Sequence, residues 1–495
     1  ITSLFTPNQL AIFNTATNTF TTIIPYVEFS SGSVITPNGA SIYTVESSAA
    51  TVTLIDAATN TVVTTIPTGA GLGGFDIITN PEGTRIYASN NISGIVTVID
   101  TATNTVVANI LTAPGLGPLS ITPDGSTVFV GSFTLDQVIL IDTATNSVIN
   151  SLATGAGPGM TSITPDGTKA FTANYLSDTV SIIDVATETI TNTINFPAGA
   201  GPYGSALLPD GSTLYIVNFL NDTATIIDVA TETITGTIPL TTPGANPFWA
   251  AATPDGKTVY IVDDTNDIVT PLDATTNTLG SAFGGTGGTF QDMVISPDPA
   301  PLAIFTATVL PLGVTTSFDA SSSISPIGTI ASYTWDFGDG QTATTTSPFI
   351  DHFYTMPGVY QVTLTVTNSA GTSTTKVFSS RFMSNNGGEE AIVNQHITIA
   401  PLPPTHLIGC QKACKFASQT DIVNALFWLP PSTGGIPLAY EIYRNTSLTK
   451  LVARVPGTTL HFFDHNRKKG KVYSYYVVSV VAPNVKSAPV SVFIP

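Results

Sequence analysis

Aromatic residues and carboxylates recur at one position of this 495-residue chain, six residues before a series of turn prolines and at the residue after it. Aromatic faces beside carboxylates suit sugar rings or cationic groups. Other copies carry Ser31-Gly32 or Gly159-Met160 at this position, so the position varies along the chain. The predicted ligand-binding residues are Phe75, Asp76, Tyr203, Phe248, Trp249 and Asp292. Ordinary packing between neighbouring repeats is the alternative explanation.

Histidine-dependent catalysis is excluded from the first 298 residues. All five histidines lie beyond them, at His352, His396, His406, His461 and His465. A Ser-His-Asp or Cys-His nucleophile and a His-bound metal therefore cannot form there. A carboxylate pair remains possible in so acidic a segment. We predict no catalytic residue, because most of these carboxylates occupy recurring turn positions where they cap backbone N–H groups.

One loop gathers oxygen ligands at Asp263, Asp264, Asn266 and Asp267. Such a set suits calcium, but the spacing is not that of an EF-hand and a solvated turn is the preferred explanation. We therefore expect no cofactor and no metal site, with calcium in this loop as the alternative.

These residues are positioned by a repeat. An aliphatic run, an Asp and then T-A-T-N or V-A-T-E recurs at steps of 42, 44, 42, 42, 44 and 45 residues. The Asp-type positions are Asn14, Asp56, Asp100, Asp142, Asp184, Asp228 and Asp273. A Pro-x-Gly turn runs beside them from Pro37 to Pro254, with a degenerate copy at Pro297. A period of roughly 40 to 45 residues with several short strands is typical of a β-propeller with one four-stranded sheet per repeat.

The repeat also predicts how the ring closes. Ile1 to Asn14 aligns without a gap to Tyr43 to Asp56, so the first copy lacks its innermost strand. Phe290 to Ser296, just before the degenerate turn, supplies a strand of that kind. We predict seven blades over residues 1–298, the closing blade built from both ends, which leaves no long open edge.

The repeat resembles the YVTN family of β-propellers. The matching segments are L-P-D-G (208–211), L-Y-I-V-N (214–218) and A-T-I-I-D-V-A-T-E-T (224–233). That family is similar to archaeal and bacterial surface-layer and secreted proteins. The resemblance therefore implies a platform for binding or assembly, and the repeat alone names no reaction.

Residues 299–384 resemble a polycystic-kidney-disease (PKD) domain, an immunoglobulin-like β-sandwich. The matching segments are F-D-A-S-S-S (318–323), Y-T-W-D-F-G-D-G (333–340), D-H-F-Y (351–354) and P-G-V-Y-Q-V-T-L-T-V-T-N (357–368). Val362, Leu364 and Val366 alternate with threonines, as expected of a half-buried strand. We place Trp335 in the core of this sandwich.

After a predicted linker at 385–400, residues 401–495 resemble a fibronectin type III domain, with Y-E-I-Y-R-N (440–445) and Y-S-Y-Y-V-V-S-V-V (473–481) as matching segments. The fold class is therefore all-β, a seven-bladed propeller followed by two immunoglobulin-like sandwiches.

Cys410 and Cys414 are the two cysteines of the chain, and we predict a disulfide between them. Free thiols and a zinc site that includes His406 are the alternatives.

Charge is distributed unevenly along the chain. Residues 1–298 carry three basic and 24 acidic residues, a net charge of −21, and residues 385–495 carry ten basic and five acidic residues, a net charge of +5. The acidic segment argues against nucleic-acid binding. The cluster Arg467, Lys468, Lys469 and Lys471 forms a basic patch that suits an anionic cell envelope or the acidic propeller of another copy. A solvated turn is the alternative explanation.

We expect a secreted or cell-surface structural protein without enzymatic activity, assembled head to tail into an outer layer or an extracellular fibre. An adhesin that binds carbohydrate or a host or neighbouring surface protein is the first alternative, and a propeller enzyme of lyase type is the second. No apolar stretch approaches the roughly 18 residues of a membrane span, so we do not expect an integral membrane protein. The basic and apolar segments of a signal peptide are missing at Ile1, from which we expect a mature or trimmed product.

Overall fold

The computed structural model describes residues 2–4, 9–25, 30–240, 244, 246–284, 290–416 and 419–495, which form β-strands joined by turns. Within this described part, one short 3-10 helix, η1 (Glu389–Ala391), stands beside the strands. The chain divides into two compact units. Unit 1 comprises Ile1–Ala300, Pro326–Gly328 and Ser369–Gly388, and unit 2 comprises Pro301–Ser325, Thr329–Asn368 and Glu389–Pro495. No helix of the described residues is long and apolar enough to cross a membrane.

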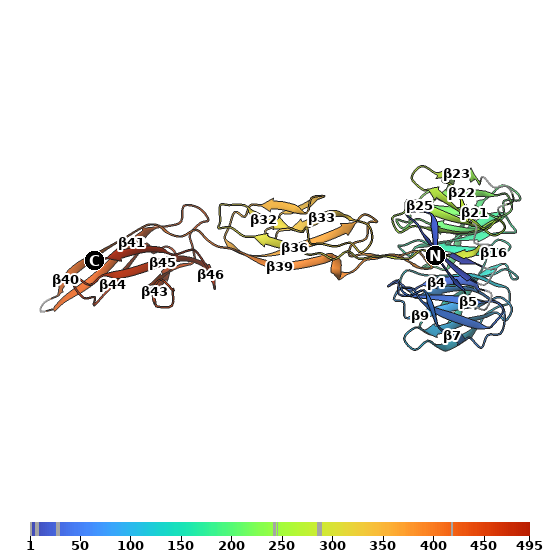
Figure 1. The fold of residues 1–495 in the computed structure, drawn as a ribbon, viewed down its shortest axis with the longest axis horizontal. Helices are drawn as coiled ribbons and strands as arrows, with labels where there is room; N and C mark the ends of the chain where they lie inside the picture. Colours follow the sequence, from blue (N-terminus) through green and yellow to red (C-terminus); the bar gives the residue numbers. More distant parts are fainter. Residues whose placement is uncertain are drawn as a thin grey trace. The chain divides into compact units, whose positions relative to one another are not determined.

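Unit 1 is a seven-bladed β-propeller, as predicted. Its described residues form seven antiparallel sheets, each with four strands in chain order apart from the closing blade and a split outer strand in the last. Figure 1 shows these strands gathered in the part of the chain that begins in blue. Each innermost strand packs on the innermost strand of the next blade, and the last packs on the first. The ring of inner strands therefore surrounds a central channel.

The strands occupy equivalent positions in every blade. The innermost strands are β4 (Ser30–Ile35), β8 (Gly74–Thr79), β12 (Leu116–Ile121), β16 (Pro158–Ile163), β20 (Pro202–Leu207), β24 (Pro247–Ala252) and β29 (Phe290–Met293). The second strands are β1 (Thr2–Leu4), β5 (Ser41–Glu46), β9 (Arg85–Asn90), β13 (Thr127–Ser132), β17 (Lys169–Asn174), β21 (Thr213–Asn218) and β25 (Thr258–Asp263). The third are β2 (Gln9–Asn14), β6 (Thr51–Asp56), β10 (Ile95–Asp100), β14 (Gln137–Asp142), β18 (Thr179–Asp184), β22 (Thr223–Asp228) and β26 (Ile268–Asp273). The outermost are β3 (Thr19–Pro25), β7 (Thr61–Pro67), β11 (Thr105–Leu111), β15 (Ser147–Ala153), β19 (Thr189–Asn195), β23 (Thr233–Pro239) and the split pair β27 (Thr278–Leu279) and β28 (Phe283–Gly284).

The closing blade combines both ends of the propeller sequence, and this prediction is confirmed. Strand β29 pairs antiparallel with β1, with Met293 opposite Thr2 and Asp292 opposite Ser3. Strands β2 and β3 complete the sheet. Because β1 pairs on both sides, its backbone N–H and C=O groups do not form an open edge.

Repeat residues explain why the blades form and how they join. Asp56 at the end of β6 accepts hydrogen bonds from the backbone and the hydroxyl of Thr59, at 2.7 and 2.8 Å, and so caps the turn that follows. The hydroxyl of Tyr43 donates to Asn104 of the next blade at 2.8 Å, and Tyr215 bonds Asn277 in the same way. The repeated Asp therefore ends a strand, while the repeated Tyr ties neighbouring blades together.

Unit 1 also includes a hairpin whose residues come after most of the PKD-like sequence. Strands β37 (Lys376–Phe378) and β38 (Met383–Asn386) form this hairpin, and β38 also pairs in parallel with β30 (Asp298–Pro299). The predicted end of the PKD-like domain at residue 384 therefore differs from the structure, in which Ser369–Gly388 belongs to the propeller unit. The physical reason is burial, because Phe378, Phe382 and Met383 lie in propeller core clusters.

Unit 2 contains two β-sandwiches. The first packs the sheet β31 (Thr306–Thr308), β32 (Thr316–Asp319) and β35 (Phe349–His352) on the sheet β34 (Thr342–Thr345), β33 (Ile330–Asp336), β36 (Gly358–Asn368) and β39 (Ile392–Ile399). Trp335 is fully buried in its core, as predicted. The predicted linker 385–400 is wrong in part, because β39 pairs with β36 along eight residues and is a strand of this sandwich.

The second sandwich of unit 2 also has two sheets. One is β40 (Thr405–Phe416), β41 (Gln419–Leu429) and β44 (His461–Asp464), and the other is β43 (Leu451–Pro456), β42 (Ala439–Tyr443), β45 (Tyr473–Ala482) and β46 (Val485–Lys486), with β47 (Val490–Ile494) also on β45. The predicted disulfide is wrong. Cys410 and Cys414 are both free and lie four residues apart on β40. At about 3.3 Å of rise per residue they are roughly 13 Å apart, whereas a disulfide requires Cα atoms within about 7 Å.

Candidate functional site

The predicted ligand residues lie on the inner strands, where the repeat explains part of their role. Asp76 accepts a hydrogen bond from the backbone N–H of Leu119 in the next blade, at 2.6 Å. Asp292 accepts the equivalent bond from Ser33 at 2.5 Å. The sulfur of Met160, at the same repeat position, accepts from the N–H of Ser205 at 3.4 Å. This position therefore links neighbouring inner strands, which is the packing role given above as the alternative.

The side chain of Arg381, at the tip of the β37–β38 hairpin, occupies the channel beside Asp76. Its guanidinium donates to both carboxylate oxygens of Asp76 at 2.6 Å and to the carbonyl of Leu119 at 2.6 Å. The carbonyl of Ser380 accepts from the N–H of Ile121 at 2.7 Å. The side chains of Arg381 and Asp76 are 7% and 1% exposed, so this is a buried, bidentate ion pair.

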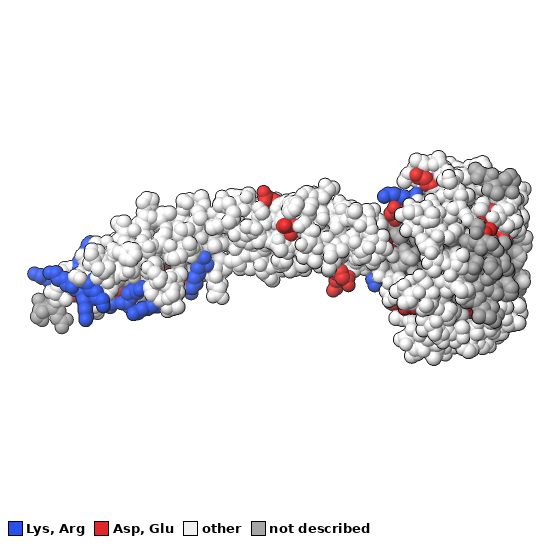
Figure 2. Space-filling view, in the orientation of Figure 1, with Lys and Arg blue, Asp and Glu red and all other residues white. Residues whose placement is uncertain are grey.

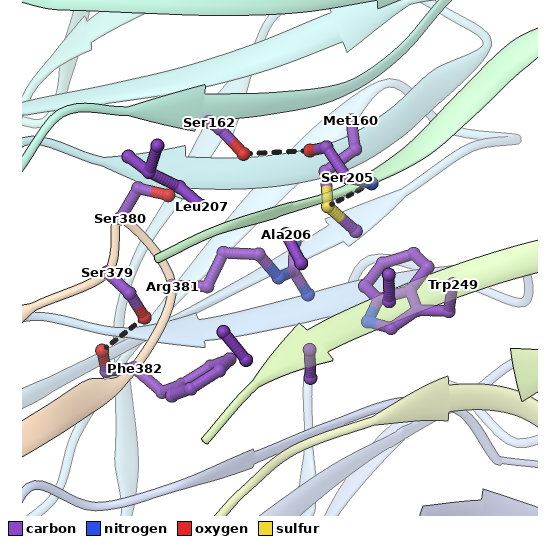
Figure 3. A pocket seen from close by; sticks show the side chains of 13 residues that line it. Met160, Ser162, Ser205, Ala206, Leu207, Trp249, Ser379, Ser380, Arg381 and Phe382 are labelled. Carbon is purple, nitrogen blue, oxygen red and sulfur yellow. Dashed lines mark hydrogen bonds between the residues drawn. The ribbon is translucent and has the colours of Figure 1, made fainter. Parts of the chain in front are cut away.

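Trp249 lies against the same guanidinium. The guanidinium carbon of Arg381 is 4.5 Å from the centre of the indole ring, a cation–π contact, and Trp249 is buried. In Figure 3 the Arg381 side chain extends from the hairpin toward Trp249. The cavity that remains among Met160, Ser205, Trp249 and Arg381 is about 20 Å³, room for about one water molecule.

Burial and charge set the protonation of this cluster. Burial would lower the pKa of Arg381, but the negative charge of Asp76 and its hydrogen bonds raise it above the usual value. Burial raises the pKa of Asp292 to about 6, against the opposing effect of the positive charge on Arg381. Burial also raises the pKa of Tyr203, with a further contribution from Asp76. The site therefore contains one arginine and two carboxylates, and the guanidinium of Arg381 forms direct hydrogen bonds with Asp76.

Two aromatic members of the predicted site, Tyr203 and Phe248, belong to an aromatic cluster that reaches Trp249 through Phe248, with ring centres 6.1 Å apart. Tyr203 and Phe248 stack with ring centres 4.6 Å apart, and Phe219 is 6.2 Å from Phe248. Tyr175 makes edge contacts with Tyr203 and Phe219 at 6.1 and 5.9 Å. Phe75 is half-buried and is in none of the ring pairs between described residues. The structure thus brings Asp76, Trp249 and Asp292 around Arg381 and groups Tyr203 and Phe248 with aromatic residues of the neighbouring turns.

The calcium candidates are engaged in separate bonds. Asp263 accepts from the backbone N–H groups of Thr265 and Asn266, at 2.7 and 3.0 Å. Asp264 accepts from the side chain of Gln291 at 2.5 Å, and burial and the charge of Asp263 raise its pKa to about 6. Over the described residues, no group of three His, Cys, Asp or Glu side chains is close enough to hold a metal ion.

A larger groove of about 760 Å³ lies where the first and last blades meet. Ile35, Tyr260 and Ile295 contribute to its apolar wall, and Asp255 lies at its rim. The carboxylate of Asp255 accepts from the hydroxyl of Thr253 and the backbone of Lys257, as expected of a turn residue. Lys257 and Asp298 also line the groove, and the ammonium of Lys257 is 3.6 Å from the carboxylate of Asp255.

Arg381 is the functional residue that the sequence did not predict. It is one of two basic residues in 299–384, within F-S-S-R-F-M (378–383), where apolar residues flank an arginine after the last strand typical of the PKD pattern. Such a segment is too apolar for a linker. That is the signal that could have indicated a buried role, but it does not name Asp76 as the partner.

Comparison with known proteins identifies the class of this fold. Residues 11–279 match the family described as lactonase, seven-bladed β-propeller, so the chain belongs to that family. Residues 298–381 match the PKD domain.

Curated relatives share a short stretch of the chain. A microbial collagenase of Vibrio alginolyticus is 40% identical over 87 residues, which are 17% of this chain and 10% of the collagenase. The pre-pro-metalloprotease PrtV of Vibrio cholerae is 44% identical over 82 residues, 17% of this chain and 8% of PrtV. The chain thus spans a tenth or less of the length of these relatives.

Two solved structures are similar to larger parts of the chain. Kuenenia stuttgartiensis hydrazine synthase matches 53% of this chain and 98% of that chain, with 18% identity and a TM-score of 0.37. A protein from Desulfotomaculum acetoxidans matches 58% of this chain and 95% of that chain, with 16% identity and a TM-score of 0.49.

Proposed function

We propose that this protein is a secreted or cell-surface structural protein without enzymatic activity, which builds an outer layer or an extracellular fibre. The observation that carries the proposal is the occupation of the propeller channel by Arg381 of the same chain. A side chain that is 7% exposed and bonded to both oxygens of Asp76 fills the position where a ligand would meet these residues.

The space around the predicted site also favours a structural role. Ligand sites usually offer a concavity of roughly 300–1,000 Å³ with a few convergent polar groups. The cavity beside Arg381 is about 20 Å³. A substrate would have to displace the hairpin, and Asp76 would then lose its ionic partner.

The family name raises the alternative of an enzyme that acts on lactones, and the lyase-type alternative also concerns the propeller. Both need an accessible acid, base or nucleophile. The propeller sequence up to residue 298 has no histidine, and Asp76 and Asp292 each hold the backbone of a neighbouring blade. These engaged carboxylates support the structural proposal over catalysis.

The relatives and the domain composition support an extracellular location. The metalloprotease PrtV carries the description pre-pro, and both it and the collagenase share a stretch about as long as the PKD match. We further propose that the propeller is of the YVTN type, since the Tyr and Asn of its repeat join neighbouring blades. The second sandwich of unit 2, with one three-stranded sheet and one larger sheet, is proposed to be of fibronectin type III.

A carbohydrate- or protein-binding adhesin is the second candidate, favoured by the aromatic cluster of Tyr175, Tyr203, Phe219 and Phe248. Aromatic faces bind sugar rings, and Tyr175, Phe219 and Phe248 are partly exposed. Trp249 does not contribute a free face, because Arg381 covers it. Loss of glycan-array binding in a Phe219→Ala variant that remains folded would favour this candidate.

The test combines an activity screen with imaging. The full chain and its Arg381→Ala variant are assayed against lactones, esters, glycans and peptides, and the native material is imaged by negative-stain electron microscopy. We expect no turnover by either protein and ordered layers or filaments in the images. Turnover by the wild type that Asp76→Asn or Asp292→Asn abolishes would overturn the proposal.

A further inference from the structure

The second sandwich of unit 2 exposes a row of apolar side chains on the outer face of the sheet β40–β41–β44. Ile408 on β40 lies opposite Phe427 on β41, and the rings of Phe427 and Phe463 are 6.0 Å apart. Ile408, Leu429 and Phe463 are 62%, 50% and 43% exposed. Leu426 and Trp428, which alternate with them on β41, are buried in the core. The sandwich core therefore leaves this stripe free, and we call Ile408, Phe427, Leu429 and Phe463 the apolar stripe.

The basic patch lies at one end of the same sheet. The N–H of Arg467 donates to the carbonyl of Ile422 on β41 at 2.8 Å, and the side chain of Gln411 on β40 donates to the carbonyl of Lys468 at 3.3 Å. Among the described residues, Lys468, Lys469 and Lys471 are exposed and take part in none of the ion pairs. Residues 401–495 carry ten basic and three acidic residues, a net charge of +7. Figure 2 shows Lys and Arg side chains gathered over this C-terminal domain.

One face of the propeller has the complementary character. The turns between second and third strands carry a leucine followed closely by an aspartate in three consecutive blades, at Leu135-Asp136, Leu176 and Asp178, and Leu220 and Asp222. These three leucines are 51%, 58% and 53% exposed. Because successive strands alternate in direction, all such turns lie on one face of the ring. We call these six residues the leucine–aspartate face.

The aspartates of this face are held in place by hydrogen bonds from backbone N–H groups. Asp136 accepts from the N–H of Gly157 at 2.8 Å, and Asp178 accepts from Gly199 and Gly201 at 2.7 and 2.8 Å. Asp222 accepts from the N–H groups of Gly244 and Asn246. These hydrogen bonds hold the three carboxylates close to the exposed leucines in three consecutive blades.

We infer that the apolar stripe and basic patch of one copy dock on the leucine–aspartate face of a second copy. The inference rests on the proposed structural role and names the surfaces through which copies meet. The two surfaces are complementary in both respects. The exposed aromatic residues of the apolar stripe can pack on the exposed leucines, and the lysines of the basic patch can approach the aspartates. The two surfaces differ, so the contact is heterologous and leaves one surface of each kind free to continue the assembly.

Each part of the interface has a distinct role. Buried aromatic anchors supply most of the affinity of such contacts, while charged groups at the rim set orientation and the rate of encounter. An anionic lipid surface would match the basic patch and the stripe. A second copy is preferred because it also supplies exposed leucines beside aspartates within a propeller of net charge −21.

The experiment uses two complementary variants of the full chain. Phe427→Ser with Phe463→Ser disables the stripe, and Leu176→Lys with Leu220→Lys disables the propeller face. Their matched controls are Leu451→Ser on the other sheet of the sandwich and Val63→Lys on the outer strand β7, where the native side chains are 51% and 58% exposed. Circular dichroism and thermal unfolding verify the fold of every protein, and light scattering over a concentration series gives the assembled mass.

We expect the wild type and both controls to assemble, and each disabled protein to associate at least about tenfold more weakly. A mixture of the two disabled proteins should form pairs that grow no further, because only one intact stripe and one intact face can meet. Added salt should weaken wild-type assembly by screening the charges.

Assembly that persists in the disabled variants would overturn the docking surfaces and leave the structural role standing. A wild type that stays monomeric at all concentrations would overturn both. Binding of the monomeric wild type to vesicles of phosphatidylglycerol and phosphatidylcholine, lost in the stripe variant, would assign the stripe to a membrane surface and refute the docking of a second copy.

Discussion

Arg381 and Asp76 are 305 residues apart in the chain and share two hydrogen bonds of 2.6 Å between guanidinium and carboxylate. Asp76 also holds the backbone of Leu119 in the next blade. The ion pair therefore connects the β37–β38 hairpin with two blades of the propeller. In the sequence this hairpin comes after the segments that match the PKD pattern. Phe382 and Met383 beside it join two different core clusters of the ring, so the hairpin contributes to the packing of both.

Arg381→Ala should strongly destabilise the propeller. Removing one member of a buried ion pair leaves the other charge without compensation, which costs about 3–5 kcal/mol. The unfolding transition of the propeller, followed by scanning calorimetry, should move to lower temperature. Arg85→Ala is the control, because the Arg85–Asp100 pair lies at the surface, with side chains 38% and 19% exposed, and surface pairs contribute about 0–1 kcal/mol. Equal effects of the two substitutions would contradict the buried ion pair.

Asp292 should make stability depend on pH. Its folded-state pKa of about 6 lies above the usual value of 3.8, so the folded protein holds this proton more tightly than the unfolded chain. Stability should therefore fall as pH rises from about 4 to about 6, by about 2–3 kcal/mol from this group. Urea unfolding at several pH values should show that Asp292→Asn becomes more stable relative to the wild type over this window. A difference that stays constant with pH would show that the carboxyl is not perturbed.

Phe290→Ala should weaken the closure of the ring. Phe290 is fully buried on β29, the strand that closes the propeller against β1, and its ring stacks on Phe20 at 5.9 Å. Truncating a buried phenylalanine costs about 3–5 kcal/mol. Val63→Ala, at an exposed position of β7, should change stability by about 0.5 kcal/mol or less. Limited proteolysis should cut the Phe290→Ala protein faster near its N-terminus, and an unchanged cleavage rate would argue against the closing role.

The two cysteines should react with a thiol reagent as free thiols. Cys410 and Cys414 are too far apart along β40 to form a bond within one chain. Reaction of the purified, non-reduced protein with a thiol reagent should therefore give two thiols per chain after unfolding, and reductant should leave the melting temperature unchanged. Mass spectrometry that finds an intrachain bridge would show that β40 takes another conformation.

The propeller and its closure could be predicted from the amino-acid sequence alone. The repeat of Asp-capped turns and aliphatic runs recurs at nearly constant spacing. Several copies, such as those of Tyr43 and Tyr215, also carry the residue that bonds the next blade. The residues that cap turns and the alternation of apolar residues along strands act over a few neighbouring positions, so both can be recognised in the amino-acid sequence. The missing inner strand of the first copy likewise indicated that β29 pairs with β1.

The residue that fills the channel, and the residues that share a face, became evident from the folded chain and not from the sequence. Arg381 belongs to no repeat, and its guanidinium contacts Asp76 and Trp249, which are more than a hundred residues away. The same holds for β39. The sequence predicted a linker there, whereas in the structure β39 pairs with the distant strand β36 and belongs to a sandwich. Burial of an ion pair and pairing of distant strands depend on the closed ring and on the packed sheets. These contacts join segments far apart in the chain, so no local pattern of residues records them.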